Sequence, residues 1–107
     1  MLYCFKSKAG ADVVMLAESG DAVLRLMGRE PAPRGILQSV DLPALLQALQ
    51  AGVDADDAEF QRRVDAAKAA GEPEPRRPSV TLRQRAWPLH ELMTRSQRHG
   101  ADVVWGV

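Results

Sequence analysis

The chain has 107 residues and equal numbers of acidic and basic side chains, so its formal net charge is zero. This length fits a single domain over residues 1–107 with one modest core, and the zero charge excludes a global field that would draw the protein to nucleic acid or anionic lipid. The single cysteine, Cys4, excludes an intrachain disulfide and a thiolate-rich zinc site. The start MLYCFKSKAG lacks the apolar core of a secretory signal, and no apolar run approaches the ~18 residues of a membrane span. We therefore expect a cytoplasmic protein that does not enter the membrane.

The N-terminal third predicts a β-hairpin, a short helix and a short strand. Residues 2–6 and 12–17 are rich in side chains that favour extended backbone, and the turn-length SKAGA separates them. Ser19 is positioned to cap a helix over residues 20–27. The prolines and glycine of the run REPAPRG then disfavour a helix, and the apolar pair that follows indicates a short strand near Ile36.

A long helical pattern follows over residues 42–70. Asp41 is positioned as its N-cap, and apolar residues recur at helical spacing from Leu42 to Ala67. Unbroken, this helix would be roughly 43 Å long at about 1.5 Å per residue, longer than a compact domain of this size is wide. Three outcomes are open: Gly52 bends the helix, the segment DADDAE interrupts it, or its second half projects.

The last third predicts a linker and a second long helix. Residues 71–78, GEPEPRRP, combine proline, glycine and charge and indicate a mobile linker. Thr81 and Gln84 then match a capping box at the start of a helix. Pro88 leaves two alternatives: it kinks a helix that begins at the capping box, or the main helix begins one residue before it.

These elements together predict an α+β fold. We expect a small, mostly antiparallel sheet built from the N-terminal hairpin, the short middle strand and a C-terminal strand over residues 102–107, with the helices packed on one face. This arrangement hides one sheet face and leaves the other more polar. The pentapeptide GADVV occurs at residues 10–14 and again at residues 100–104. We interpret the two copies as independent uses of a turn followed by β-branched residues, because their flanks share no further similarity.

Three stretches of the chain resemble a known family: MLYCFKSKAGADVVML at the start, LRQRAWPLHELM in the last helix and VVWGV at the end. In combination they are similar to the short bacterial proteins of the domain of unknown function 1840 family (DUF1840). The similarity covers the chain apart from the middle stretch from DADDAE to RRP. The resemblance implies a stand-alone cytoplasmic protein without an assigned activity, so no functional residue is carried over from it.

Neither histidine lies in a complete catalytic or metal-binding motif. His90 opens the sequence HELMT, in which Thr94 stands where an HExxH zinc helix needs its second histidine, so we expect no metal and no cofactor. His99 and Asp102 could act as base and orienting carboxylate, but no Ser or Cys lies beside them in the sequence. An enzyme that uses His90 or His99 is therefore the third of three functional hypotheses.

The second hypothesis is binding of nucleic acid or a phosphate-bearing ligand by the Arg-rich last helix. Its candidate ligand-binding residues are Arg83, Trp87, His90, Arg95 and Arg98. A basic and aromatic face of this kind can grip phosphate or stack on a base. The alternative is that Arg83 and Arg85 pair with the acidic residues 54–59 and that Trp87 packs inward. We favour this alternative, because the net charge supplies no supporting field.

The first hypothesis is a small non-catalytic binding or regulatory module. If the second half of the long helix projects, its apolar stripe needs a cover, and a second copy of the chain could supply it in a homodimer. The candidate interface residues are Phe60, Val64 and Ala67. In the alternative, the helix breaks and folds back on its own core. The sequence leaves these two arrangements equally open.

Overall fold

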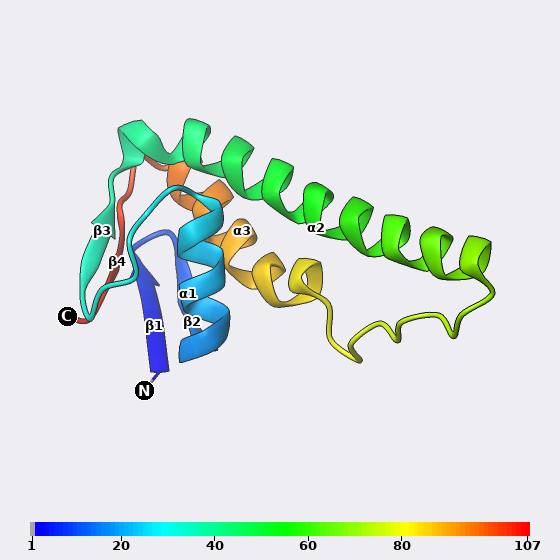
Figure 1. The fold of residues 1–107 in the computed structure, drawn as a ribbon. Coiled ribbons are helices and arrows are strands. Elements are labelled where there is room, and N and C mark those ends of the chain that lie inside the picture. Colours follow the sequence, from blue (N-terminus) through cyan, green and yellow to red (C-terminus); the bar gives the residue numbers. More distant parts are fainter. Residues whose placement is uncertain (1) are drawn as a thin grey trace.

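The computed structural model describes residues 2–107, which form four strands, three α-helices and one short 3₁₀ turn (Figure 1). The strands make one antiparallel sheet in the order β2-β1-β4-β3. Along the chain the elements are β1 (Leu2–Ser7), β2 (Gly10–Leu16), α1 (Ala17–Leu26), β3 (Gly35–Leu37), the 3₁₀ turn η1 (Ser39–Asp41), α2 (Leu42–Ala70), α3 (Leu82–Arg98) and β4 (Val103–Trp105). The predicted α+β class is confirmed, with the hairpin, the middle strand and the C-terminal strand in one sheet.

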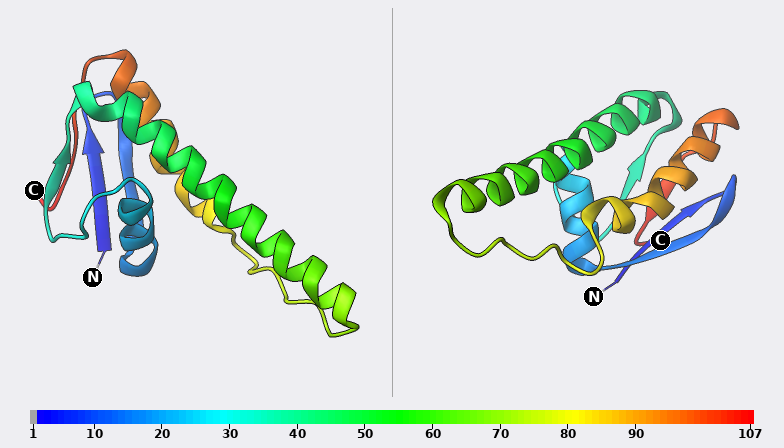
Figure 2. Two further views of the ribbon diagram at one scale, coloured as in Figure 1. Left: turned by 45° about the horizontal axis from the view of Figure 1, so that its top comes forward. Right: turned by 90° about the vertical axis from the view of Figure 1, so that its right-hand side faces the viewer.

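The sheet has an inner face that packs against the helices and an outer face that no described helix covers (Figure 2). Side chains alternate along β1, so Tyr3 and Phe5 point into the core whereas Leu2 and Lys6 point outward. Tyr3 stacks on Phe5 with 5.7 Å between ring centroids, and Phe5 lies 5.6 Å from the ring of Trp105. The hydrophobic core therefore lies between the inner face and the helices, as expected.

Helix α1 begins directly after β2 and not at the predicted cap. Its first residue is Ala17, and Leu16 occupies the cap position without a side-chain hydrogen bond. Ser19 lies inside the first turn, where it is buried and its hydroxyl accepts a hydrogen bond from Arg85. The prediction that Ser19 caps this helix is wrong, because no loop separates β2 from α1 and the last strand residue must itself stand at the helix end.

Helix α2 is continuous from Leu42 to Ala70, so neither Gly52 nor the DADDAE segment interrupts it. Asp41 occupies the N-cap position as predicted, although its side chain makes no cap hydrogen bond. A Cβ at Gly52 would lie only 2.7 Å from Leu26 Cδ2, so this glycine allows α1 to pack closely against α2. Gly52 thus serves helix packing and does not bend the helix.

The second half of α2 projects from the rest of the molecule (Figure 2). The fully buried residues of α2 all lie in its first half: Leu42, Leu45, Leu49 and Val53. Beyond Val53 no residue of the helix is fully buried, and the molecule measures 51 × 27 × 22 Å. Of the three outcomes left open for this helix, the structure shows the projecting one.

Residues 71–81 run back along the projecting part of α2, and we call residues 54–81 the arm (Figure 2). Arg77 joins the two segments: its Nη1 lies 3.4 Å from Asp57 Oδ1, and its guanidinium lies 4.9 Å from the ring centroid of Phe60. The residues predicted to need a cover are half-buried: Phe60, Val64 and Ala67. The linker of the same chain therefore supplies part of the cover for the apolar stripe.

Helix α3 begins at the predicted capping box. Thr81 Oγ1 accepts a hydrogen bond from the backbone N–H of Gln84 at 3.2 Å, and Gln84 Oε1 accepts one from the backbone N–H of Thr81 at 2.8 Å. Pro88 lies inside this helix. The alternative in which the main helix begins next to Pro88 is therefore wrong. The helix ends before Gly100, which adopts a φ of 62°.

Strand β4 is shorter than the predicted strand over residues 102–107. Gly106 adopts a φ of 76°, and a Cβ there would lie 2.2 Å from the carbonyl oxygen of Pro33. The chain therefore leaves the sheet after Trp105, and only glycine fits this close approach. Val107 is 74% exposed and does not extend the inner face.

Candidate functional site

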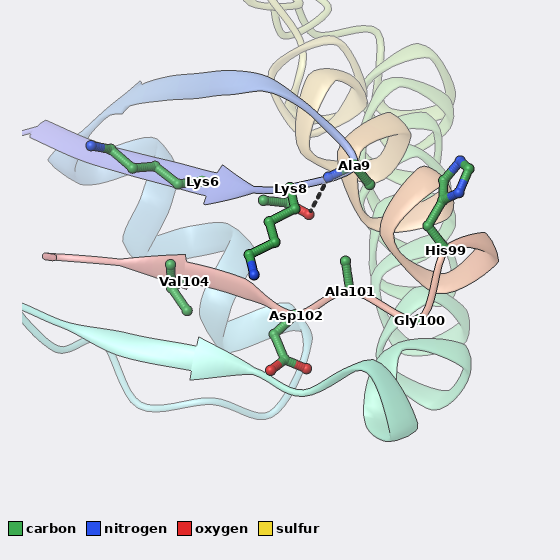
Figure 3. Close-up of a pocket in the computed structure, with 9 residues that line it drawn as sticks. Lys6, Lys8, Ala9, His99, Gly100, Ala101, Asp102 and Val104 are labelled. Carbon is green, nitrogen blue, oxygen red and sulfur yellow. Dashed lines mark hydrogen bonds between the residues drawn. The ribbon is translucent and has the colours of Figure 1, made fainter.

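A cleft opens where strands β1 and β4 separate (Figure 3). The two strands pair only through Phe5 with Trp105 and through Lys6 with Val104. Beyond Lys6, the hairpin turn faces the connection between α3 and β4 across a gap. The cleft has a volume of about 800 Å³ and is lined by residues 6–9, residues 99–102 and Val104.

Separate hydrogen bonds anchor the two walls of the cleft. On the hairpin side, the hydroxyls of Ser7 and Ser96 lie 2.7 Å apart. Because Ser96 donates its proton to the carbonyl of Leu92 at 2.6 Å, Ser7 is the donor between the two hydroxyls. On the other side, Asp102 Oδ1 accepts the backbone N–H of Ser39 at 2.8 Å. The hairpin is therefore tied to α3, and the start of β4 is tied to η1, which leaves the gap between them.

Cationic side chains gather around this cleft. Lys8 extends from the hairpin turn into the gap, and Lys6 lies where the cleft opens onto the outer sheet face (Figure 3). Among residues 2–107, neither lysine has a carboxylate within the 4.0 Å of an ion pair. Arg95 lies beside the same hairpin, since a Cβ at Gly10 would be 3.8 Å from its Cδ. The only acidic side chain that lines the described cleft is Asp102.

His99 and Asp102 both line the cleft, but they do not form the base and carboxylate pair that their spacing allows. The ring of His99 points away from the Asp102 carboxylate (Figure 3). Within residues 2–107, no hydrogen bond joins the two side chains, and Asp102 bonds to the backbone of Ser39. The Ser7 hydroxyl is also engaged, because it donates to Ser96 and accepts the backbone N–H of Ala9 at 3.2 Å. The arrangement offers positive charge to a ligand and no aligned nucleophile and base.

The structure divides the predicted Arg-rich stripe between the two ends of α3. Arg83 lies against the arm, where its Nη2 is 2.5 Å from Asp54 Oδ1 and its Nε is 2.9 Å from Asp57 Oδ2. Hydrogen bonds from Arg83 lower the pKa of both carboxyl groups below their usual range. Pairing with the acidic segment is thus confirmed for Arg83. Arg95 and Arg98 lie near the opposite end of the helix, roughly 20 Å away at about 1.5 Å per residue.

Trp87 and His90 stack on one side of α3. Their ring centroids are 5.2 Å apart and their planes differ by 8°. Trp87 is 53% exposed, so the prediction that it packs inward is wrong. The hollow that these residues line with Leu49, Val53 and Arg83 has a volume of about 10 Å³, which is room for about one water molecule. His90 Nδ1 is buried and has no hydrogen-bond partner among the described residues.

Sequence reasoning missed Lys6 and Lys8. A signal was present, because two of the three lysines in the chain lie at the predicted hairpin turn, Lys6 before it and Lys8 within it. The position of this turn opposite residues 99–102 could not be predicted, because it depends on the pairing of the first strand, β1, with the last strand, β4.

Comparison with known proteins identifies the family. A family model described as "Domain of unknown function (DUF1840)" matches residues 1–105, and the chain belongs to this family. No curated protein and no solved structure matches the chain. In the part of the chain from residue 2 to residue 107, no helix has the length and apolar character needed to cross a lipid bilayer. In the same residues, no three His, Cys, Asp or Glu side chains are grouped to hold a metal ion.

Proposed function

We propose that this DUF1840 protein is a non-catalytic binding module that holds the phosphate group of a small ligand in the cleft between β1 and β4. The observation that carries the proposal is the position of Lys8, which extends into a cleft of about 800 Å³ and forms no ion pair with a carboxylate of residues 2–107. A lysine ammonium is a compact point charge with three rotatable donors, and it forms strong charge-assisted hydrogen bonds with phosphate oxygens.

The balance of charge around the cleft supports an anionic ligand. Lys6 and Lys8 line the cleft, and Arg95 lies beside the hairpin that carries them. Against these cations stand the Asp102 carboxylate and the C-terminal end of α3, which carries about half a negative charge. The cations exceed this negative charge, so a surplus remains for a ligand. The Asp102 carboxylate also accepts the backbone N–H of Ser39 and is therefore already engaged within the protein.

The size of the cleft and the net charge of the protein favour a small ligand over a nucleic acid. Small-molecule sites in proteins span about 300 to 1,000 Å³, and the cleft falls within this range. A long polyanion needs a basic surface that extends along its backbone. Here the arginine at the arm end of α3, Arg83, is already paired with two carboxylates, and the net charge of the chain is zero.

A titration followed by nuclear magnetic resonance tests the proposal. Inorganic phosphate or pyrophosphate, added to ¹⁵N-labelled protein at low salt, should shift the amide signals of residues 8–9 and 99–102. Lys8→Gln should weaken pyrophosphate binding about tenfold, the loss of one charge-assisted contact worth about 1.4 kcal/mol. Lys68→Gln is the matched control, because Lys68 lies on the arm beside Glu74, away from the cleft. The affinity of this variant for pyrophosphate should stay within about twofold of wild type.

Two results would overturn this function. One is the absence of amide shifts at the cleft with pyrophosphate, or equal affinity of wild type and Lys8→Gln. The other is a gel shift with single-stranded RNA at low salt in a protein that does not respond to pyrophosphate, which would point to an extended polyanion site instead.

A further inference from the structure

The outer face of the sheet is more apolar than the sequence pattern indicated. We define this face by the outward side chains of the four strands: Leu2, Cys4, Lys6, Asp12, Val14, Leu16, Ile36 and Val104. Leu16 is 69% exposed, Leu2 is 60% exposed and Val14 is 59% exposed. The expected polar character is limited to Lys6 and Asp12. Solvent-exposed sheet faces of antiparallel sheets are ordinarily polar, so these apolar side chains call for a physical explanation.

The strand register gathers these side chains into two adjoining patches. Leu2 pairs with Leu16, and Cys4 pairs with Val14, so four apolar side chains form one block on β1 and β2. On the same face, Val104 of β4 pairs with Ile36 of β3, which is 41% exposed. Together the exposed apolar surface is roughly 400 Å², within the range of the largest patch on a typical monomer, where such patches are often functional.

The charges on this face favour a second copy of the same chain as its occupant. Lys6 and Asp12 are exposed on neighbouring strands, and within residues 2–107 neither side chain forms an ion pair. A strongly acidic or basic partner would compensate only one of them. A two-fold axis parallel to the sheet plane, between two facing copies, brings both into use, because it can place each Lys6 opposite the partner's Asp12.

We propose that the protein self-associates through the outer face, with two sheets packed face to face. The apolar surface buried would be roughly 800 Å² over both copies, about half of the ~1,600 Å² of a standard protein–protein interface, with Lys6 and Asp12 in the polar remainder. Because interfaces at the small end of the range are typically transient, we expect a weak, reversible dimer, with a dissociation constant on the order of 10–100 μM. The outer face shares Lys6 and Val104 with the lining of the cleft but does not include Lys8, on which the proposed ligand site rests, so the dimer is tested in protein without phosphate ligands.

Sedimentation velocity from about 5 to about 500 μM tests the dimer, since this range spans the expected dissociation constant. Wild type should shift from monomer to dimer. Leu16→Glu, which places a charge in the exposed apolar block, should raise the dissociation constant at least about tenfold. Val40→Glu is the matched control, because Val40 is 81% exposed in η1, outside the outer face, and its dissociation constant should stay within about twofold of wild type.

A charge exchange tests the pairing without altering the apolar block. Lys6→Asp should weaken the dimer, because two like charges then meet across the axis, and the double variant Lys6→Asp with Asp12→Lys should restore it. Cys4 provides an independent readout, because this single cysteine lies within the outer face and is half-buried in the monomer. Its reaction with a maleimide should slow as wild-type protein is concentrated and should not slow in Leu16→Glu.

Three results would overturn the proposal. The first is a wild-type protein that stays monomeric at about 500 μM. The second is a dimer that Leu16→Glu leaves intact and Val64→Glu abolishes, which would place the contact on the arm. The third is binding of wild type, but not of Leu16→Glu, to vesicles of anionic phospholipid without self-association, which would make the outer face a membrane contact.

Discussion

Replacing Gly20 by alanine should destabilise the protein, although the same change in most helix interiors is stabilising. Gly20 lies in α1, where the gain in helix propensity from glycine to alanine is about 1 kcal/mol. A Cβ at this position, however, would lie 2.1 Å from Tyr3 Cδ2 and 2.6 Å from Tyr3 Cε2. No real side chain tolerates such distances, so the aromatic ring or the helix must move.

The Tyr3 ring has little freedom to move away. It is 2% exposed, it stacks on Phe5, and its hydroxyl donates a hydrogen bond to Asp21. Overpacking of a core costs about 1–3 kcal/mol, and we take the upper end because the ring is held on three sides. After subtraction of the propensity gain, Gly20→Ala should lower the free energy of unfolding by about 2 kcal/mol, or the melting temperature by roughly 10 °C.

Urea unfolding followed by circular dichroism measures this effect. Gly52→Ala is the comparison, because its added Cβ would lie 2.7 Å from Leu26 Cδ2, the end of a side chain that can shift, and 3.1 Å from Leu26 Cβ. Its loss of stability should therefore be smaller than that of Gly20→Ala. In a Tyr3→Leu background, Gly20→Ala should be neutral or stabilising. A Gly20→Ala protein as stable as wild type would refute the reasoning that this glycine is required for the contact between α1 and the inner face.

Two further predictions concern charge. Burial and the hydrogen bond to Asp21 raise the pKa of Tyr3 to about 12. The unfolded chain therefore ionises first, and stability should fall on the order of 1–2 kcal/mol between about pH 10 and pH 12, a loss that Tyr3→Phe should abolish in urea titrations. At the arm, Arg83→Gln should raise the pKa of Asp54 and Asp57 toward ordinary values in carboxyl-detected titrations. Because these pKa values are depressed in the folded protein, the Arg83 contact stabilises the arm above about pH 4 and weakens as the pH falls further. Lower protection factors of the arm amides below that pH would support this, and an unchanged pKa in Arg83→Gln would contradict it.

Elements with a local cause were predictable, and elements defined by packing were not. The capping box at Thr81 and Gln84 is visible in the sequence because both partners lie within one helical turn. Ser19 has the chemistry of an N-cap, yet it lies inside α1, because the preceding strand continues to Leu16 to pair with Leu2. Hydrogen-bond pairing in the sheet therefore outweighed a local cap preference.

The candidate cleft was beyond local reasoning for the same reason. Its walls come from residues 6–9 and 99–102, which are about 90 residues apart in the chain and meet because β1 pairs with β4. The sequence did show that Arg83 has acidic residues within reach, and the structure confirms this pairing. It could not show that Arg95 lies beside the hairpin that borders the cleft while Arg83 lies against the arm.

The sequence by itself determined the α+β class, the hairpin, the two long helices and the family, because hydrophobic period, glycine positions and capping residues act over a few neighbouring residues. Only the tertiary structure decided that the second half of α2 projects, that one sheet face stays open and apolar, and that two lysines border a cleft at its end. These features depend on which distant segments share a surface. That choice is made by the packing of the whole core around Phe5, Leu89 and Trp105, and no short stretch of the chain encodes it.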